Sequence, residues 1–216
     1  MRLFKYMVAS MLFVGALAVA PASYAANDVA LVTALRGNVN RVAKEGPGAL
    51  EAFVKLRQGD VLTLEKGSTV KLVYFSSARQ ESWTGEGRLE IAANESKGTG
   101  LADPEVKILP AILVKQIART PSLDSQGRAG VMRLRAIATP DAIAKLDREY
   151  TQMRTTSELG DINPEIFLLS GLFEMRELDR VEALIGEMEV ARKNELEARV
   201  LISLYRKALK NVRESK

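Results

Sequence analysis

The hydrophobic pattern of this chain changes its period once. Between residues 27 and 92, apolar and polar residues alternate in short runs, separated about every ten residues by turns that contain glycine, one of which is a loop predicted at residues 45–48. From Pro140 onward, the apolar residues instead recur three or four positions apart. Alternation is typical of half-buried strands, and the longer period is typical of helices. We therefore expect an α+β protein, with a small N-terminal antiparallel β sandwich or roll followed by a C-terminal α-helical bundle.

The first 25 residues form a separate segment. Arg2 and Lys5 precede an apolar run at residues 7–20, and small side chains occupy Ser23 and Ala25. This is the pattern of a secretory signal peptide cleaved after Ala25. The apolar run is shorter than the roughly 20 residues that a membrane-spanning helix needs. We expect a periplasmic protein with no membrane span after cleavage.

Two absent residue types narrow the chemistry. The chain has neither cysteine nor histidine. Disulfides, Ser-His-Asp triads, cysteine nucleophiles, ordinary zinc sites and the usual haem and iron-sulfur ligation are therefore excluded. The 31 basic residues, two of which leave with the signal, nearly balance the 27 acidic ones, so no strong field favours nucleic acid. We expect no cofactor, no metal site and no nucleic-acid partner.

The stretch from Leu56 to Phe75 carries the strongest β-pattern. Gly59-Asp60 and Lys66-Gly67 are turn dipeptides, and the residues after the second one alternate between apolar and polar. This predicts a hairpin. Ser68 and Lys71 also match the Ser-x-x-Lys spelling of penicillin-binding serine enzymes, which needs both side chains on one face of a helix. On a strand, positions three apart face opposite ways, so we expect no catalysis from this pair.

Two further runs follow the hairpin. Residues 79–84 and 88–92 are predicted as strands, with Gly85-Glu86-Gly87 as a turn between them. Glu81, Glu86 and Glu90 are the acidic residues of this region. Because they lie next to turns or alternate with basic residues, we expect them to be solvated, which disfavours a carboxylate-based hydrolase.

Trp83 is the only tryptophan, and it lies among polar residues. Such an aromatic side chain is a common platform for a sugar ring or for a partner's side chain. The alternative is a tryptophan that packs on the sheet while its N–H bonds a carbonyl or water. Both interpretations stay open, and Arg79, Glu81 and Trp83 are the first candidate partner-binding residues.

Several motifs in the β-region share an order and spacing with a known family. They are Gly37-Asn38-Val39, Leu56 with Gly59-Asp60, Gly67 to Leu72, and Leu89-Glu90-Ile91. Together they resemble the FecR-type periplasmic domain, which implies a recognition module at residues 26–102. Sensor members of that family carry an anti-sigma segment and a transmembrane helix before the domain. This chain shows neither, so we do not expect signalling to a sigma factor.

The middle of the chain, residues 103–139, is predicted as a helix, a loop and a strand that returns to the sheet. A polar linker at residues 94–103 precedes a helix at 104–119. Residues 131–137 alternate, and Arg133 and Arg135 would share a face if the segment is extended. These two arginines are candidate ligands for an anionic group or partner.

The last part, residues 140–216, is predicted as the helical bundle. One amphipathic helix starts near Asp141 and ends before Gly160, and Asn163 caps the next helix, with Pro164 in its first position. Residues 164–197 resemble a single tetratricopeptide hairpin, and a third helix covers 195–212.

We therefore expect an exported, non-catalytic binding or adaptor protein of the bacterial cell envelope, whose partner is another envelope protein. A glycan (peptidoglycan) binding module centred on Trp83 is the first alternative. A structural stabiliser of a complex and a carboxylate-based hydrolase are the others. The candidate partner-binding residues are Arg79, Glu81, Trp83, Arg133 and Arg135.

Overall fold

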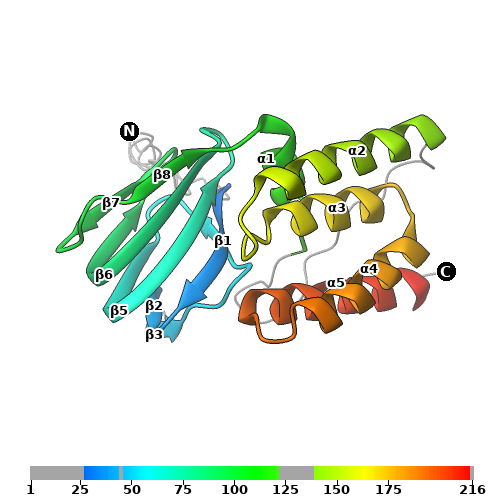
Figure 1. The fold of residues 1–216 in the computed structure, drawn as a ribbon. Coiled ribbons are helices and arrows are strands. Elements are labelled where there is room, and N and C mark those ends of the chain that lie inside the picture. The colour runs from blue at the N-terminus through cyan, green and yellow to red at the C-terminus, as the bar shows by residue number, and fades with distance from the viewer. Residues whose placement is uncertain (1–26, 44–45, 122–138, 215–216) are drawn as a thin grey trace, which may run out of the picture.

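The computed structural model describes residues 27–43, 46–121 and 139–214. In these residues an eight-stranded antiparallel sheet packs against five helices (Figure 1), which confirms the expected α+β class. The predicted signal peptide and the predicted strand with Arg133 and Arg135 lie outside the described residues. Within the described ranges, no helix has both the length and the apolar character to cross a membrane.

Two long strands organise the sheet. The strands are β1 (Asp28–Arg36), β2 (Val39–Ala43), β3 (Gly46–Ala49), β4 (Lys55–Arg57), β5 (Val61–Tyr74), β6 (Arg79–Ile91), β7 (Ser96–Thr99) and β8 (Glu105–Ile108). The first part of β5 pairs with β2 and its last part with β1, while the first part of β6 pairs with β8 and its last part with β7. The long β5–β6 hairpin therefore belongs to two layers, one containing β3, β2 and β7, the other containing β4, β1 and β8.

The turn predicted at Lys66-Gly67 was wrong. The register between β5 and β6 shifts between Leu64 and Ser68, so this dipeptide forms a bulge inside one continuous strand. Gly67 has a φ of 77°, which only glycine adopts without strain. Gly85-Glu86-Gly87, also predicted as a turn, lies in β6 close to the bulge. Bulges bend and twist a strand, and this one carries the hairpin from one layer into the other.

The two layers enclose one apolar cluster, and the helices enclose another. Buried side chains between the layers include Leu62 and Leu89 from one layer and Val70 and Leu72 from the other. On the opposite face of β1 and β5, Leu31 and Val73 are buried with the helical side chains. The layer that contains β1 is therefore covered on both faces, as its nearly continuous apolar sequence requires.

The helices surround one buried member. They are α1 (Ala111–Ile117), α2 (Pro140–Thr156), α3 (Asn163–Glu174), α4 (Leu178–Ala191) and α5 (Leu196–Glu214). Every residue of α3 from Asn163 to Phe173 is buried, and α3 packs against α1, α2 and α4. Gly171 permits the close approach of α2, because a Cβ there would lie 2.5 Å from Leu146 Cδ1. α1 and α5 contact the sheet, so sheet and helices share a common core.

Three other local predictions were also wrong. Residues 94–103, predicted as a linker, contain β7, which is paired with β6. Residues 104–119 are not one helix, since β8 precedes α1 and Pro110 separates them. The loop predicted at residues 45–48 overlaps β3. In each case a tertiary partner strand overrode the local sequence preference.

Candidate functional site

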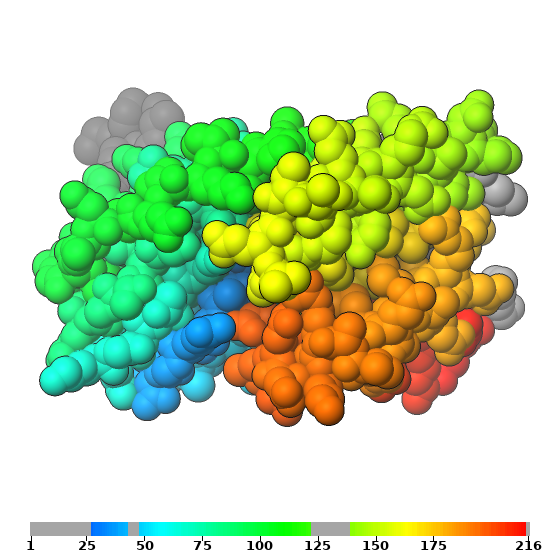
Figure 2. Space-filling view, in the orientation of Figure 1, coloured from blue at the N-terminus to red at the C-terminus, as the bar shows by residue number. Residues whose placement is uncertain are grey.

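A cleft of about 560 Å³ opens between the sheet and the ends of the helices. We call it the sheet–helix cleft. Its floor comes from β1, β5, β6 and β8, and its walls come from the α2–α3 loop and the start of α5. Figure 2 shows the sheet block and the helical block meeting along this boundary, with β1 (blue) between them. The lining residues are Thr33, Ala34, Leu35, Arg36, Thr69, Lys71, Ser82, Thr84, Glu105, Gly160, Asp161, Ile162, Asn163, Glu195 and Glu197.

The floor is a row of polar side chains on adjacent strands. Lys71 lies in register with Ala34 on one side and Ser82 on the other. Thr69 lies opposite Thr84, and their hydroxyl oxygens are 3.2 Å apart. The same face of β5 is apolar further along the strand, where helices cover it. Because side chains alternate along a strand, the polar residues Thr69 and Lys71 lie on this same face, at the part of β5 that the helices do not cover.

One buried carboxylate holds the α2–α3 loop in place. Glu165, whose side chain is 5% exposed, accepts hydrogen bonds from Arg154 Nη1 at 3.1 Å and pairs with Arg192 Nη2 at 3.1 Å. Arg154 Nη1 also donates to the carbonyl of Asp161 at 2.7 Å. Buried charges are tolerated when they are paired and fully hydrogen-bonded. This network joins α2, α3 and α4 and fixes the wall of the cleft.

The wall is also attached to the floor. Asn163 Nδ2 donates to Gln80 Oε1 on β6 at 2.8 Å, and both side chains are buried. The prediction that Asn163 caps α3 was wrong: Ile162 is the N-cap, and the Asn163 backbone N–H donates to Asp161 Oδ1 at 3.0 Å. Asn163, 2% exposed, keeps a buried Oδ1 that has no hydrogen-bond partner among the described residues.

Four charges around the cleft have neither an ion-pair partner nor a side-chain hydrogen bond within the described part of the chain. Arg36 and Lys71 are cationic, and Glu105 and Glu197 are anionic. By contrast, Glu195 is paired with Arg192 at 2.7 Å. Charges of both signs, supplemented by hydroxyl donors and acceptors, suit a polar ligand that itself carries both signs. The residues that line the cleft include no aromatic side chain.

Two of the predicted site residues, Glu81 and Trp83, lie inside the sandwich. Glu81 is 0% exposed and Trp83 is 4% exposed. Trp83 Nε1 donates to Glu81 Oε2 at 2.9 Å, and Arg79 Nε donates to Glu81 Oε1 at 2.6 Å. The prediction that Glu81 is solvated was therefore wrong. Trp83 packs inside the sheet with its N–H satisfied, and a carboxylate replaces the carbonyl or water we expected as its acceptor.

This buried cluster joins three strands. The backbone N–H of Ser96 on β7 donates to Glu81 at 3.2 Å, and the Ser96 and Tyr74 hydroxyl oxygens are 2.6 Å apart. Burial raises the pKa of the Tyr74 phenol above its usual value. Arg79 is half-buried at the rim of the cluster. All of these polar groups have partners, so the cluster serves the fold.

The two residues of the Ser-x-x-Lys motif, Ser68 and Lys71, lie on opposite faces of β5. Ser68 is buried on the inner face of β5, where its Oγ accepts from the Asn38 N–H at 3.0 Å and donates to the Asn38 carbonyl at 2.9 Å. Lys71 lies on the opposite face, in the cleft. Glu86 and Glu90 are exposed, as predicted. Nowhere in the described ranges do three or more potential metal ligands come together.

No local sequence pattern predicts the cleft. Lys71 is recognisable in the sequence only as half of the Ser-x-x-Lys motif, and the polar positions of β1, β5 and β6 belong to separate strands. Their alternation was a usable signal, but which face the helices leave open depends on the tertiary fold. No family model, no curated protein and no solved structure matches this chain. The FecR-type and tetratricopeptide resemblances remain predictions.

Proposed function

We propose that this protein is an exported, non-catalytic binding protein of the bacterial cell envelope, and that its sheet–helix cleft receives a polar segment of a partner protein. One observation carries the proposal. Arg36, Lys71, Glu105 and Glu197 surround one cleft without ion-pair partners in the described structure. Lys71 and Glu197 are half-buried, and a partly desolvated charge is stabilised by a group of opposite charge, so these two favour a ligand that supplies one. Arg36 and Glu105 are exposed at the rim of the same cleft.

A peptide segment fits the cleft better than a sugar. A peptide offers carboxylate, ammonium or guanidinium groups for the free charges, and backbone N–H and C=O groups for the threonine and serine hydroxyls. The cleft volume of about 560 Å³ is within the usual range for a bound ligand. Sugar rings are commonly bound against an aromatic face. The lining contains none, and Trp83 is buried elsewhere.

The floor and walls of the cleft are also held in a fixed conformation, which favours ligand binding. The floor residues belong to paired strands, and the Glu165 network fixes the wall. Rigid elements lose little conformational entropy when a ligand binds. The FecR-type resemblance and the predicted signal peptide support an envelope location.

Photocrosslinking in living cells tests the proposal. A photoreactive phenylalanine derivative replaces Thr84 on the cleft floor in the full chain with its own leader. The matched control places the same residue at Thr63, which is also an exposed threonine on a long strand but belongs to the other layer. We expect a discrete adduct with an envelope protein from position 84, none from position 63, and a reduced yield from position 84 when Lys71→Met is added.

Three results would contradict the proposal. The first is equal crosslinking from positions 84 and 63, and the second is the absence of any adduct at 84. The third is an adduct at 84 that is removed by a muramidase but resists protease, which would identify a cell-wall glycan as the ligand. Separately, turnover of peptidoglycan or glycosides by the purified protein that disappears in Glu105→Gln, without unfolding, would overturn the non-catalytic interpretation.

A further inference from the structure

Strand β8 is an edge strand of the sheet within the described part of the chain. Among the described strands it pairs only with β6, so its other edge has no strand partner. All four of its residues are exposed, including Val106 at 40% and Ile108 at 66%. An exposed edge strand presents unpaired N–H and C=O groups, and it is a template for another strand.

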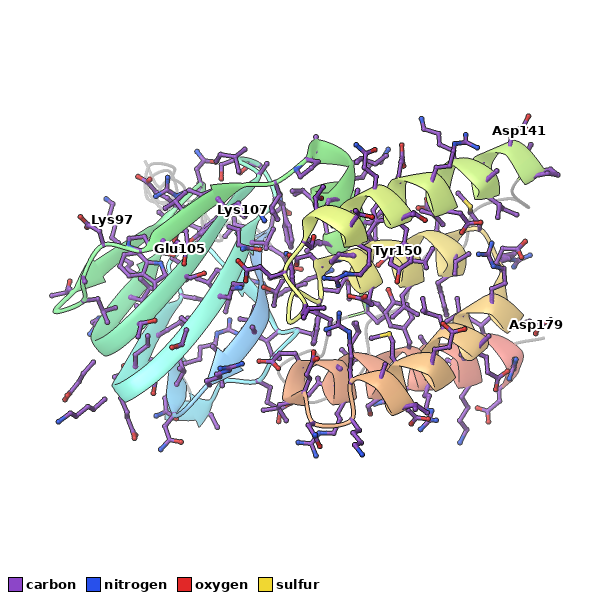
Figure 3. All side chains as sticks on the ribbon, viewed as in Figure 1. Lys97, Glu105, Lys107, Asp141, Tyr150 and Asp179 are labelled. Carbon is purple, nitrogen blue, oxygen red and sulfur yellow. The ribbon has the colours of Figure 1, made fainter. Side chains whose placement is uncertain are left out.

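The side chains of β8 separate into a charged side and an apolar side. Glu105 and Lys107 lie in register with Ser82 and Gln80, and therefore point toward the helical side of the sheet. Val106 and Ile108 point to the other side. Figure 3 labels Glu105 and Lys107 on this strand. Neither has an ion-pair partner within the described residues.

We propose that the β8 edge binds the β8 edge of a second copy of this chain, antiparallel, about a two-fold axis at Val106. In this register Glu105 lies opposite Lys107 of the partner subunit, and the same pair repeats on the other side of the axis. Val106 lies opposite Val106 of the partner subunit. Opposite charges in directly facing positions stabilise an antiparallel pair, and a two-fold contact closes without forming fibres.

The strand sequence favours a second copy over an unrelated strand. Its charge order, Glu-Val-Lys, is complementary to itself when read antiparallel. A shift of one residue would place Val106 opposite Lys107 of the partner subunit and lose both ion pairs, so the register is specified. Pro104 and Pro110 flank β8 and limit how far pairing extends, because proline has no N–H to donate. The interface is therefore small, and the dimer is expected to be weak.

Such a dimer has a consequence for the cleft. An antiparallel pair about an axis perpendicular to the sheet keeps equivalent faces on the same side. Glu105 lines the cleft and would be paired with Lys107 of the partner subunit at the proposed contact, which leaves Arg36, Lys71 and Glu197 as the charges available to a ligand in the dimer. The two clefts would therefore lie on the same face of one continuous sheet, next to each other.

Charge reversal tests the register. Analytical ultracentrifugation of the mature protein, up to about millimolar concentration, is expected to show a monomer–dimer equilibrium. Lys107→Glu and Glu105→Lys each place like charges opposite each other twice, and each should raise the dimer dissociation constant at least about tenfold. A mixture of these two variants should recover dimers, since every facing pair is then opposite in sign. Lys97→Glu, on the exposed strand β7, is the control and should change nothing.

A cysteine provides a second, independent measurement. The chain has no cysteine, so Val106→Cys introduces a single thiol. On the axis, facing residues have Cα atoms about 4.5–5.5 Å apart, which a disulfide spans. Mild oxidation should give a covalent dimer at Val106→Cys much faster than at the control Lys97→Cys. A wild type that is monomeric at every concentration, a mixture that does not recover, or equal crosslinking of the two cysteine variants would each overturn the proposal.

Discussion

Glu81 and Lys71 lie on neighbouring rungs of the β5–β6 ladder but on opposite faces. Glu81 is paired in register with Leu72, and Lys71 with Ser82. The inward carboxylate has no exposed surface and accepts hydrogen bonds from Arg79, Trp83 and Ser96. The outward ammonium lines the cleft and has no ion-pair partner in the described part of the chain. The charge of Glu81 therefore stabilises the sheet, whereas the charge of Lys71 is available to bind a ligand.

The largest expected effect is at the interior charge. Glu81→Gln replaces a carboxylate that three donors surround, so the Arg79 guanidinium loses its nearer counter-charge, keeping only Glu95 at 3.9 Å, and the new amide N–H₂ faces other donors. Removing one member of a buried ion pair costs about 3–5 kcal/mol. Because the amide retains one acceptor, we expect the free energy of unfolding to fall by about 3 kcal/mol, measured by urea unfolding of the purified protein and followed by circular dichroism.

Glu86→Gln is the matched control for this prediction. Glu86 lies on the same strand but is exposed, so its change should remain within about 0.5 kcal/mol of the wild type. Equal effects of the two substitutions would show that Glu81 is not the structural charge that its contacts indicate.

The packing of Trp83 predicts the next largest effect. Gly98 of β7 lies against the indole, and a Cβ added there would be 2.5 Å from Trp83 Cζ3. Overpacking of this kind costs about 1–3 kcal/mol, so Gly98→Ala should destabilise the protein by about 2 kcal/mol in the same unfolding experiment.

Gly186→Ala is the opposite case within the helices. Gly186 is exposed in α4, and nothing lies within 4 Å of its added Cβ. Because glycine is unfavourable inside a helix, alanine there should stabilise the protein by about 0.5–1 kcal/mol. If Gly98→Ala were also neutral or stabilising, Trp83 would not be packed against β7, and an accessible ring would again be a candidate platform.

Alkaline pH should lower the free energy of unfolding through the buried phenol of Tyr205. Burial raises the pKa of the Tyr205 phenol, whose oxygen lies 2.7 Å from Ser170 Oγ. Above pH 10 the unfolded tyrosine loses its proton while the folded one keeps it. The unfolded state then binds fewer protons, and stability falls as pH rises, by about 1.4 kcal/mol per pH unit for this group. Below pH 10 this dependence is absent.

Tyr205→Phe isolates that contribution. Urea unfolding at pH 9 to 11 should give equal slopes against pH below pH 10. Above pH 10 the slope of the variant should be shallower than the wild-type slope by about 1.4 kcal/mol per unit, because Tyr74 and the other groups contribute equally to both proteins. Identical slopes would show that the Tyr205 hydroxyl titrates normally and is accessible.

The fold class followed from the sequence because hydrophobic period is a local property. Alternation before residue 92 and the helical period after Pro140 predicted the two parts, and both are observed. The bend in the β5–β6 hairpin was not predictable in the same way. Lys66-Gly67 has the composition of a turn, and only the continuing pairing with β6 shows that it is a bulge. Turn composition reports backbone conformation, while pairing depends on distant strands.

The candidate site was harder to predict for a related reason. Glu81 and Trp83 are two positions apart, so the sequence places them on one face, but it does not say which face is covered. Layer packing buries that face, and helices leave part of the opposite face open at Lys71. Asp161 and Asn163 reach the cleft from 90 positions further along the chain, and no local pattern connects them with β5.

The smallest expected change in stability is at Lys71, and it distinguishes the two regions most directly. Lys71→Met keeps the unbranched stem and removes the charge. Because no described residue pairs with that charge, the free energy of unfolding should stay within about 0.5 kcal/mol of the wild type. Lys66→Met, on the exposed bulge of the same strand, is the control. Both variants should unfold like the wild type, but only Lys71→Met should reduce crosslinking from Thr84. A loss of more than about 1 kcal/mol in Lys71→Met would assign this lysine to the fold, and the cleft would then lose the cation on which its proposed role depends.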